Sequence, residues 1–314
     1  MLRELVTPGN DTRYIFFAGK GGVGKSTISA ATAVWLADKG FKTLLVSTDL
    51  QRSLSDIFEN NIGCRMTAIP GTPLLTVMET EPQELVRENW HRLTGAVQEV
   101  FGPSELLELM GKEITPCMME MASFYKLMEL YTERARDFDA LVFDTAPGGR
   151  ALIEITLPFI MAKRYGTVDL FAEFRPGNPG NKEKKITQIT NQERRTRETM
   201  ELITNPERTF FVYVLCPESL PIAEAERAMG ELRTNQISVP GIVINQVLPR
   251  EEVLHANTTY FWKRLEMQQK YLTRIQEAFP HKQIAVVPLL PNEVKGIPAL
   301  RTIASNLYGS DEDE

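Results

Sequence analysis

The chain has 314 residues, of which 43% are hydrophobic, and its formal net charge is -6 at pH 7. This length and composition are sufficient for one large core, and the acidic balance gives nucleic acid no general electrostatic reason to bind. No stretch approaches the roughly 18 consecutive apolar residues that a membrane-spanning helix requires, and the start, MLRELVTPGNDTR, lacks the pattern of a secretory signal peptide. We therefore expect a cytoplasmic protein that does not bind nucleic acid.

Short apolar runs alternate with amphipathic stretches along the chain, which is typical of strands and helices around a mostly parallel sheet. Seven strands are predicted, at Tyr14–Ala18, Thr43–Ser47, Leu74–Met78, Ala140–Phe143, Phe210–Leu215, Gly241–Val247 and Ile284–Val287. Two of them, 210–215 and 241–247, are almost wholly apolar, as in strands that helices bury on both faces. We expect a single α/β domain over residues 1–314, with helical insertions at about 82–136 and 150–205 and a short acidic tail at 309–314.

A glycine-rich segment follows the first predicted strand and precedes a helical run at 27–38. It fits the P-loop pattern G-x-x-x-x-G-K-[ST] and consists of Gly19, Lys20, Gly21, Gly22, Val23, Gly24, Lys25, Ser26 and Thr27. In such a loop the backbone N–H groups converge on phosphate oxygens, and the following helix adds its partial positive charge. Lys25 would contact the β and γ phosphates, and the Ser26 hydroxyl would bind Mg²⁺. The segment predicts an α/β P-loop NTPase that uses ATP and Mg²⁺.

Two acidic residues follow predicted strands, and parallel strands place them at one edge of the sheet. Asp49 follows KTLLVST, and Asp144 follows ALVF. Ligands of open α/β folds bind at this edge, so Asp49 could orient attacking water and Asp144 could hold Mg²⁺ through a water molecule. The alternative for Asp49 is the N-cap of a short helix at Ser53–Phe58.

The segment GKGGVGKST resembles the deviant Walker A motif of the SIMIBI class of ATPases, in which the early lysine, here Lys20, reaches the partner's nucleotide in a homodimer. Within that class, segments 47–56 and 144–149 resemble the two switches of the ArsA family, and segments 243–249 and 288–296 resemble its adenine-binding segments. The resemblance covers 16–308 and implies catalytic roles for Asp49 and Lys20. It also implies further nucleotide-binding residues, which are Asn245, Pro288, Pro291 and Glu293. The residues alone leave open that Asn245 only forms a turn.

The switch segments depart from the family's pattern at several positions. These are Leu50, Gln51 and Arg52 in the first switch and Gly148 and Arg150 in the second. Because both family histidines are replaced by arginine, we expect altered turnover or coupling. Targeting members of the family carry a zinc-binding CxxC, whereas Thr258 and Phe261 stand at those positions here, so no zinc site is expected.

The first helical insertion carries apolar side chains at roughly helical spacing, many of them methionines. Flexible methionines suit a surface that repacks around varied apolar partners. Since the resemblance includes the ATPase that targets tail-anchored membrane proteins, we interpret this stripe as a groove for transmembrane segments of client proteins. The groove residues would be Met110, Met118, Met119, Met121, Phe124, Leu127 and Met128. Ordinary core packing is the alternative.

Two other functions remain open. The family also includes the arsenite-pump ATPase, whose soft metalloid would require three thiolates. Cys117 resembles a metalloid-binding position of that pump, but Cys64 and Cys216 are distant in sequence, and we interpret them as structural. A nucleotide-dependent scaffold or partitioning ATPase is the third alternative. The targeting function is preferred, and it implies a homodimer that associates transiently with a membrane receptor; the pump would instead require an efflux channel.

Overall fold

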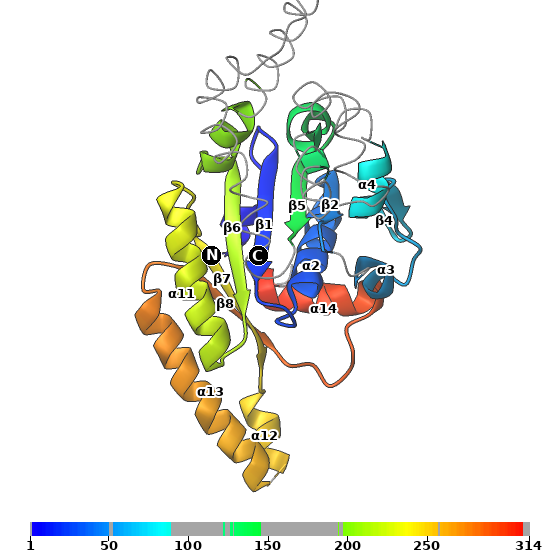
Figure 1. Ribbon diagram of the computed structural model, residues 1–314. Coiled ribbons are helices and arrows are strands. Elements are labelled where there is room, and N and C mark those ends of the chain that lie inside the picture. The colour runs from blue at the N-terminus through cyan, green and yellow to red at the C-terminus, as the bar shows by residue number, and fades with distance from the viewer. Residues whose placement is uncertain are drawn as a thin grey trace, which may run out of the picture.

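One sheet organises the residues that the structure, a computed structural model, describes: 2–49, 53–88, 122, 126–127, 129–145, 194, 197–256 and 258–309. The strands of this sheet lie in the order β3-β4-β2-β5-β1-β6-β7-β8 (Figure 1). Their bounds are β1 Arg13–Gly19, β2 Thr43–Ser47, β3 Thr67–Ile69, β4 Thr72–Glu79, β5 Ala140–Asp144, β6 Thr209–Leu215, β7 Gly241–Val247 and β8 Gln283–Pro288. All neighbouring strands are parallel except β3, which is antiparallel to β4.

The predicted α/β class is confirmed, and all seven predicted strands are present. Strand β3 was not predicted, because its three residues, Thr67-Ala68-Ile69, are too few to show a period of two. It forms a hairpin with β4 around Gly71, whose φ of 81° is a conformation that glycine adopts readily. β3 therefore closes one edge of an otherwise parallel sheet.

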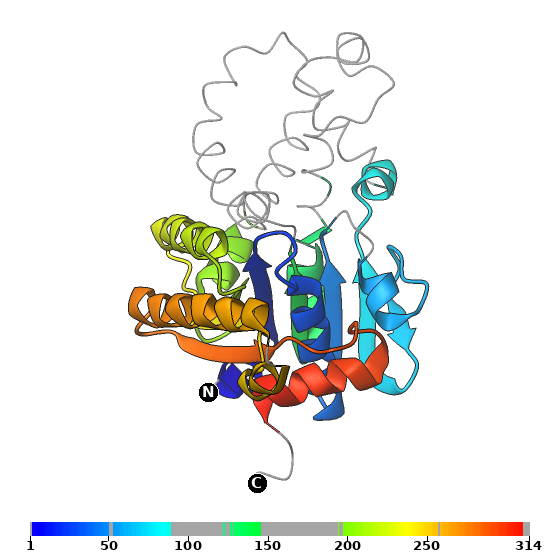
Figure 2. The ribbon, with the colours of Figure 1, turned by 90° about the horizontal axis from the view of Figure 1, so that it is seen from below.

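Helices cover both faces of the sheet. Their bounds are α1 Leu2–Val6, α2 Lys25–Asp38, α3 Ser53–Phe58, α4 Pro82–Glu88, the π-helix η1 Leu130–Arg134, the 3₁₀-helix η2 Ala135–Asp137, α11 Ser219–Thr234, α12 Arg250–Ala256, α13 Thr259–Ala278 and α14 Gly296–Tyr308. Helices α1, α2, α3 and α14 pack on one face, whereas η1, η2, α11 and the end of α13 pack on the other (Figure 2). The candidate site lies where β1, β2 and β5 end.

Alternation along the strands divides the core into two clusters. In β1, Ile15 and Phe17 face α2 and α14, while Tyr14 and Phe16 face the other layer. Phe16 stacks between Phe143 of β5 and Phe211 of β6, with ring centroids 4.7 and 4.6 Å apart. These three strands therefore form a packed centre that holds the end of β1, where the P-loop begins.

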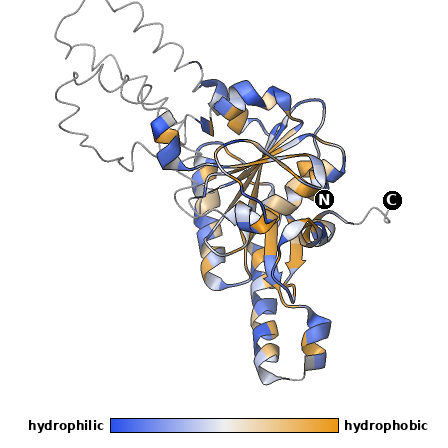
Figure 3. Cartoon of the chain, turned by 90° about the vertical axis from the view of Figure 1, so that its right-hand side faces the viewer, coloured by the Kyte–Doolittle hydropathy of each residue, from blue (hydrophilic) through white to orange (hydrophobic). Residues whose placement is uncertain are grey.

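Helices α12 and α13 project beyond the sheet (Figures 1 and 3). The start of α13 exposes three aromatic side chains, Tyr260, Phe261 and Trp262, at 68%, 40% and 45% of their surface. Within the described ranges, no helix is long and apolar enough to cross a membrane.

The two predicted insertions are described only in part. Residues 82–88, 122, 126–127 and 129–136 belong to the first, and 194 and 197–205 to the second. All of them except Asn205 are helical. The division into one domain with two insertions and an acidic tail stays a prediction.

Candidate active site

The segment Gly19–Ser26 forms a loop between β1 and the start of α2. Gly24 precedes α2 with φ 91° and ψ 25°, a left-handed conformation that favours glycine, and no side chain caps the helix. An added Cβ at this position would also collide with the side-chain amide of Asn245. The N–H groups at the start of α2 are therefore left to an anionic ligand, as a phosphate-binding loop requires.

Lys25 is the buried cation of the loop, with 5% of its surface exposed. Its ammonium donates a hydrogen bond of 3.3 Å to the carbonyl oxygen of Lys20. Burial lowers the pKa of Lys25, while the charges of Asp144 and Asp49 oppose this change. The two carboxylates therefore lie near Lys25, as expected for residues at the same sheet edge.

Asp144 ends β5 and is fully buried. The Ser47 hydroxyl donates to Oδ2 at 3.1 Å, whereas Oδ1 is buried without a hydrogen-bond partner. Burial raises the pKa of Asp144 to about 6, although Ser26, Lys25 and Ser47 all favour the ionised form. An unsatisfied buried carboxylate oxygen beside a serine hydroxyl supplies the hard oxygen donors that Mg²⁺ prefers. Ser26 and Asp144 therefore suit the predicted Mg²⁺ site, and their contacts with the ion stay a prediction.

Asp49 follows β2 and is half-buried, and its N–H donates to the Ser47 hydroxyl at 3.2 Å. Glu79 of β4 bonds amides at the start of α3, and the N-cap alternative for Asp49 stays a prediction. Glu79 Oε1 accepts from the N–H of Leu54 at 2.7 Å and of Ser55 at 3.4 Å. A carboxylate suits this place because the N-terminus of a helix carries partial positive charge.

Helix α3 also contacts the P-loop directly. The Ser53 hydroxyl donates to the Ser26 hydroxyl at 3.0 Å, and the Ser55 hydroxyl donates to Glu79 Oε2 at 2.7 Å. Sequence reasoning missed Glu79, and it included Ser53 in the first switch without predicting its bond to Ser26. The signal for Glu79 was available, because a charged residue that ends an apolar strand is the same pattern that singled out Asp144.

A cavity of about 320 Å³ lies beside the P-loop. Its lining includes Gly24 of the loop and Thr27 of α2, together with Asn245, Pro288 and Glu293 from the predicted adenine-binding segments. Pro291 is exposed and does not line the cavity. The structure therefore brings together most of the predicted nucleotide-binding residues, and their contacts with nucleotide stay a prediction.

The amide of Asn245 has a partner that neither the nucleotide-binding role nor the turn alternative predicts. Its Nδ2 donates to the carbonyl oxygen of Val23 at 2.9 Å, so one of its two N–H groups bonds the P-loop. The cause is an irregularity between Ile244 and Val247, where the register of β7 against β8 shifts. A bulge re-aims side chains, and here it turns Asn245 toward the loop.

Lys20 forms an ion pair of 3.8 Å with Glu224 of α11. Both side chains are about one-third exposed, at 33% and 29%. Within one subunit Lys20 therefore extends toward α11, and its predicted contact with a partner's nucleotide stays a prediction.

Other predicted residues are only partly placed. Leu127 is 6% exposed and belongs to the same core cluster as Leu130 and Tyr131. This agrees with ordinary core packing, the alternative to a groove at this position. The remaining groove residues lie outside the described ranges, as do Cys117 and the altered switch positions, which are Met110, Met118, Met119, Met121, Phe124, Met128, Leu50, Gln51, Arg52, Gly148 and Arg150. Thr258 and Phe261 are exposed at the start of α13. Within the described ranges, no cluster of three or more His, Cys, Asp or Glu could hold a metal.

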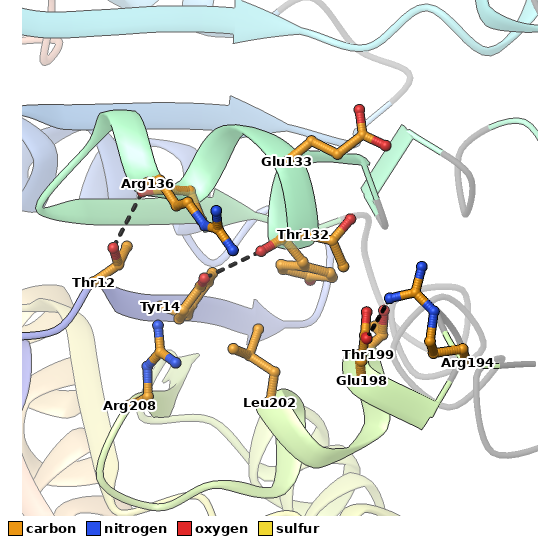
Figure 4. A pocket seen from close by; sticks show the side chains of 12 residues that line it. Thr12, Tyr14, Thr132, Glu133, Arg136, Arg194, Glu198, Thr199, Leu202 and Arg208 are labelled. Atoms are coloured by element: carbon orange, nitrogen blue, oxygen red, sulfur yellow. Dashed lines mark hydrogen bonds and ion pairs between the residues drawn. The ribbon is translucent and has the colours of Figure 1, made fainter. Parts of the chain in front are cut away.

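A second cavity, of about 420 Å³, lies at the opposite edge of the sheet, where β1 and β6 begin (Figure 4). Arg136 and Arg208 extend toward Tyr14 from either side, and Arg194 pairs with Glu198 at 2.8 Å. The lining mixes both charges and includes no P-loop residue. This cavity is therefore not the phosphate site, although it is the larger of the two.

Comparison with known proteins gives a family match over residues 12–309, to the family described as anion-transporting ATPase. The chain is 32% identical to a Halobacterium salinarum protein assigned as an arsenical pump-driving ATPase, over 99% of this chain but 46% of that protein. It is 32% identical to the ATPase ASNA1 homolog 1 of Paramecium tetraurelia, over 92% of this chain and 90% of that protein. It is 31% identical to the ATPase get3 of Schizosaccharomyces pombe, over 94% and 91%. The chain thus spans less than half of the Halobacterium protein but nearly all of the other two.

Proposed function

This chain belongs to the anion-transporting ATPase family and is an ATPase, and we propose that it uses ATP hydrolysis to capture transmembrane segments of tail-anchored membrane proteins. It would act as a cytoplasmic homodimer that meets a membrane receptor only transiently. Arsenite efflux is the second candidate, because relatives assigned as arsenical pump-driving ATPases also match.

The separation of two thiols is the observation that favours targeting over the pump. The Sγ of Cys64 accepts from the Glu81 N–H at 3.3 Å, just beyond β4, whereas Cys216 directly follows β6. Strands β2, β5 and β1 lie between β4 and β6, which separates the two thiols by roughly 19 Å at about 4.8 Å per strand. Burial also raises the pKa of each thiol to about 11, so both are protonated at neutral pH. These cysteines cannot join Cys117 in a three-thiolate site within one subunit.

The chemistry follows from the residues at the sheet edge. The loop amides and Lys25 would bind the phosphates, while Asp49 would orient the attacking water. Mg²⁺, held by Ser26 and Asp144, would neutralise charge on the β and γ phosphates.

Hydrolysis could move α3, because that helix is bonded to the loop. When Ser26 turns toward the phosphates, its bond from Ser53 must lengthen or break. Glu79 holds the start of α3 to β4, so the helix would pivot near this contact. A small change at the phosphates is thereby passed to the first switch, as in other nucleotide switches.

The homodimer is part of the proposal. Lys20 lies at the mouth of the loop and is one-third exposed, so it could reach a neighbouring subunit once Glu224 releases it. Exposed aromatic side chains at the start of α13 are the kind of surface that marks protein contacts. Lys20→Ala should therefore reduce turnover while leaving the fold intact.

The test combines ATP hydrolysis with client capture. A fluorescent transmembrane segment from a tail-anchored protein is presented without detergent, and its retention in solution is measured with ATP, with ADP and with the inactive variant Lys25→Ala. Met118→Asp with Met121→Asp should abolish retention. Met66→Asp is the matched control, because Met66 is 39% exposed, lies between α3 and β3 and is not one of the predicted groove residues.

Each result decides between the candidates. Retention that the groove variant loses and the control keeps supports targeting. Stimulation of hydrolysis by arsenite that disappears in Cys117→Ser, with no segment retained, would make the chain a pump ATPase. Wild-type hydrolysis in Lys25→Ala would contradict the phosphate site itself.

A further inference from the structure

The side-chain amide of Gln268 connects α13 to the end of β7. Gln268 is 4% exposed. Its Oε1 accepts from the N–H of Leu248 at 2.8 Å, and its Nε2 donates to the carbonyl oxygen of Gln246 at 3.1 Å. One buried side chain therefore satisfies the backbone on both sides of Val247.

The same backbone segment carries two amides that reach the P-loop. Asn245 Nδ2 donates to the carbonyl oxygen of Val23 at 2.9 Å, and Gln246 Nε2 donates to that of Gly22 at 3.4 Å. Gln246 has φ 61°, a left-handed conformation that is unfavourable for a residue with a side chain. Because Gln268 bonds the carbonyl of Gln246, it helps to hold this residue in place.

The two loop carbonyls determine the direction of two loop N–H groups. In a planar trans peptide, the N–H of the next residue points opposite to the C=O. Fixing the oxygens of Gly22 and Val23 outward therefore directs the N–H groups of Val23 and Gly24 inward, where phosphate oxygens would bind. Preorganised N–H groups bind an anion without a further ordering cost.

We propose that Gln268 is a positioning residue of the nucleotide site and acts on the P-loop through Gln246 and Asn245. This inference rests on ATP as the ligand of the loop and is independent of the client. It links the projecting helix α13, more than 200 residues away in sequence, to the loop that begins at Gly19.

Two variants separate the bonds. Gln268→Met keeps the length of the side chain and removes both hydrogen bonds. Gln268→Glu keeps the acceptor for Leu248 N–H but places a carboxylate oxygen against the Gln246 carbonyl. Gln269→Met is the matched control, because Gln269 is exposed on the same helix.

Three experiments are carried out on the full chain well below its unfolding temperature. They measure ATP affinity with a fluorescent analogue, KM and kcat of hydrolysis, and hydrogen–deuterium exchange of residues 19–25 without nucleotide. We expect Gln268→Met to raise the Kd and KM for ATP about tenfold, the equivalent of one to two hydrogen bonds, and to change kcat much less. Exchange in residues 19–25 should become faster. Gln268→Glu should show the same direction, and Gln269→Met should match the wild type.

The inference is overturned if both Gln268 variants fold and match Gln269→Met in Kd and loop exchange, even when their unfolding temperature falls, because Gln268 would then serve stability alone. Should Gln268→Met not fold, Gln268→Glu carries the same comparison. The exchange measurement needs no ATP, so it reports on the loop even if the nucleotide differs. If the wild type binds ATP with normal affinity but does not retain the client segment, the targeting proposal is contradicted and this inference is unaffected.

Discussion

Replacing Asp144 by asparagine should stabilise the nucleotide-free protein while it abolishes hydrolysis. Burial raises the pKa of this carboxyl from 3.8 to about 6, which means that ionising it costs more in the folded than in the unfolded chain. The difference corresponds to about 3 kcal/mol at neutral pH. Asparagine mimics the protonated acid and can still accept the hydrogen bond from Ser47, so Asp144→Asn should gain up to about this amount.

The pH dependence tests the cause. Between pH 3.8 and 6 the folded state holds a proton that the unfolded state has lost, so the stability of the wild type falls as pH rises through this window. The gain from Asp144→Asn should therefore be small at pH 4, grow up to pH 6 and stay constant above it.

The assay is urea unfolding from pH 4 to 8, in EDTA and without nucleotide. Asp137→Asn, at an exposed carboxylate, removes the same formal charge and is the matched control. A variant that is less stable than the wild type at pH 7, or whose gain does not vary with pH, would refute the argument that burial raises the pKa of Asp144.

Three further changes test separate contacts. Asp49→Asn should keep ATP affinity within about twofold and slow single-turnover hydrolysis at least about a hundredfold, because only water orientation is lost; normal turnover would remove Asp49 from the chemistry. Glu224→Gln frees Lys20 from a pair whose side chains are about one-third exposed and which stabilises the monomer by no more than about 1 kcal/mol. Sedimentation with ATP should therefore show up to about fivefold tighter association, and unchanged sedimentation would mean that the pair does not restrain Lys20. Tyr308→Phe loses a buried hydroxyl contact of 2.7 Å with Thr32 and should lower the free energy of unfolding by about 1–2 kcal/mol at unchanged hydrolysis, as measured by urea unfolding.

The sequence predicts the strands and the P-loop well because their signals are local. Apolar runs mark β1, β6 and β7, and a spacing of glycines, Lys25 and a hydroxyl marks the loop. The sequence also predicts Asp144 and Asp49 as site residues, because each follows an apolar run that marks a strand. It does not find Gln268, since nothing in an amphipathic helix such as α13 shows which glutamine turns inward.

Asn245 shows a second limit. Its position at the end of β7 is predicted, but its partner depends on a register shift against β8, which is a property of two strands far apart in sequence. The shift turns the amide to Val23 rather than leaving it for a purine alone. Side-chain roles that depend on the fit between distant strands therefore lie beyond what periodicity can predict.

The order of the strands explains why Asp144 is both buried and useful. β5 lies between β2 and β1, so the end of β5 is level with Ser47 on one side and Phe17 on the other. The acid is thereby enclosed by the two strands that lead to Asp49 and to the P-loop. An acid at the free edge of the sheet would keep its water and its ordinary pKa, but it could not contact both segments at once. At the end of β5, burial raises the free energy of the ionised Asp144. The same position lets this one residue act on both the P-loop and the first switch.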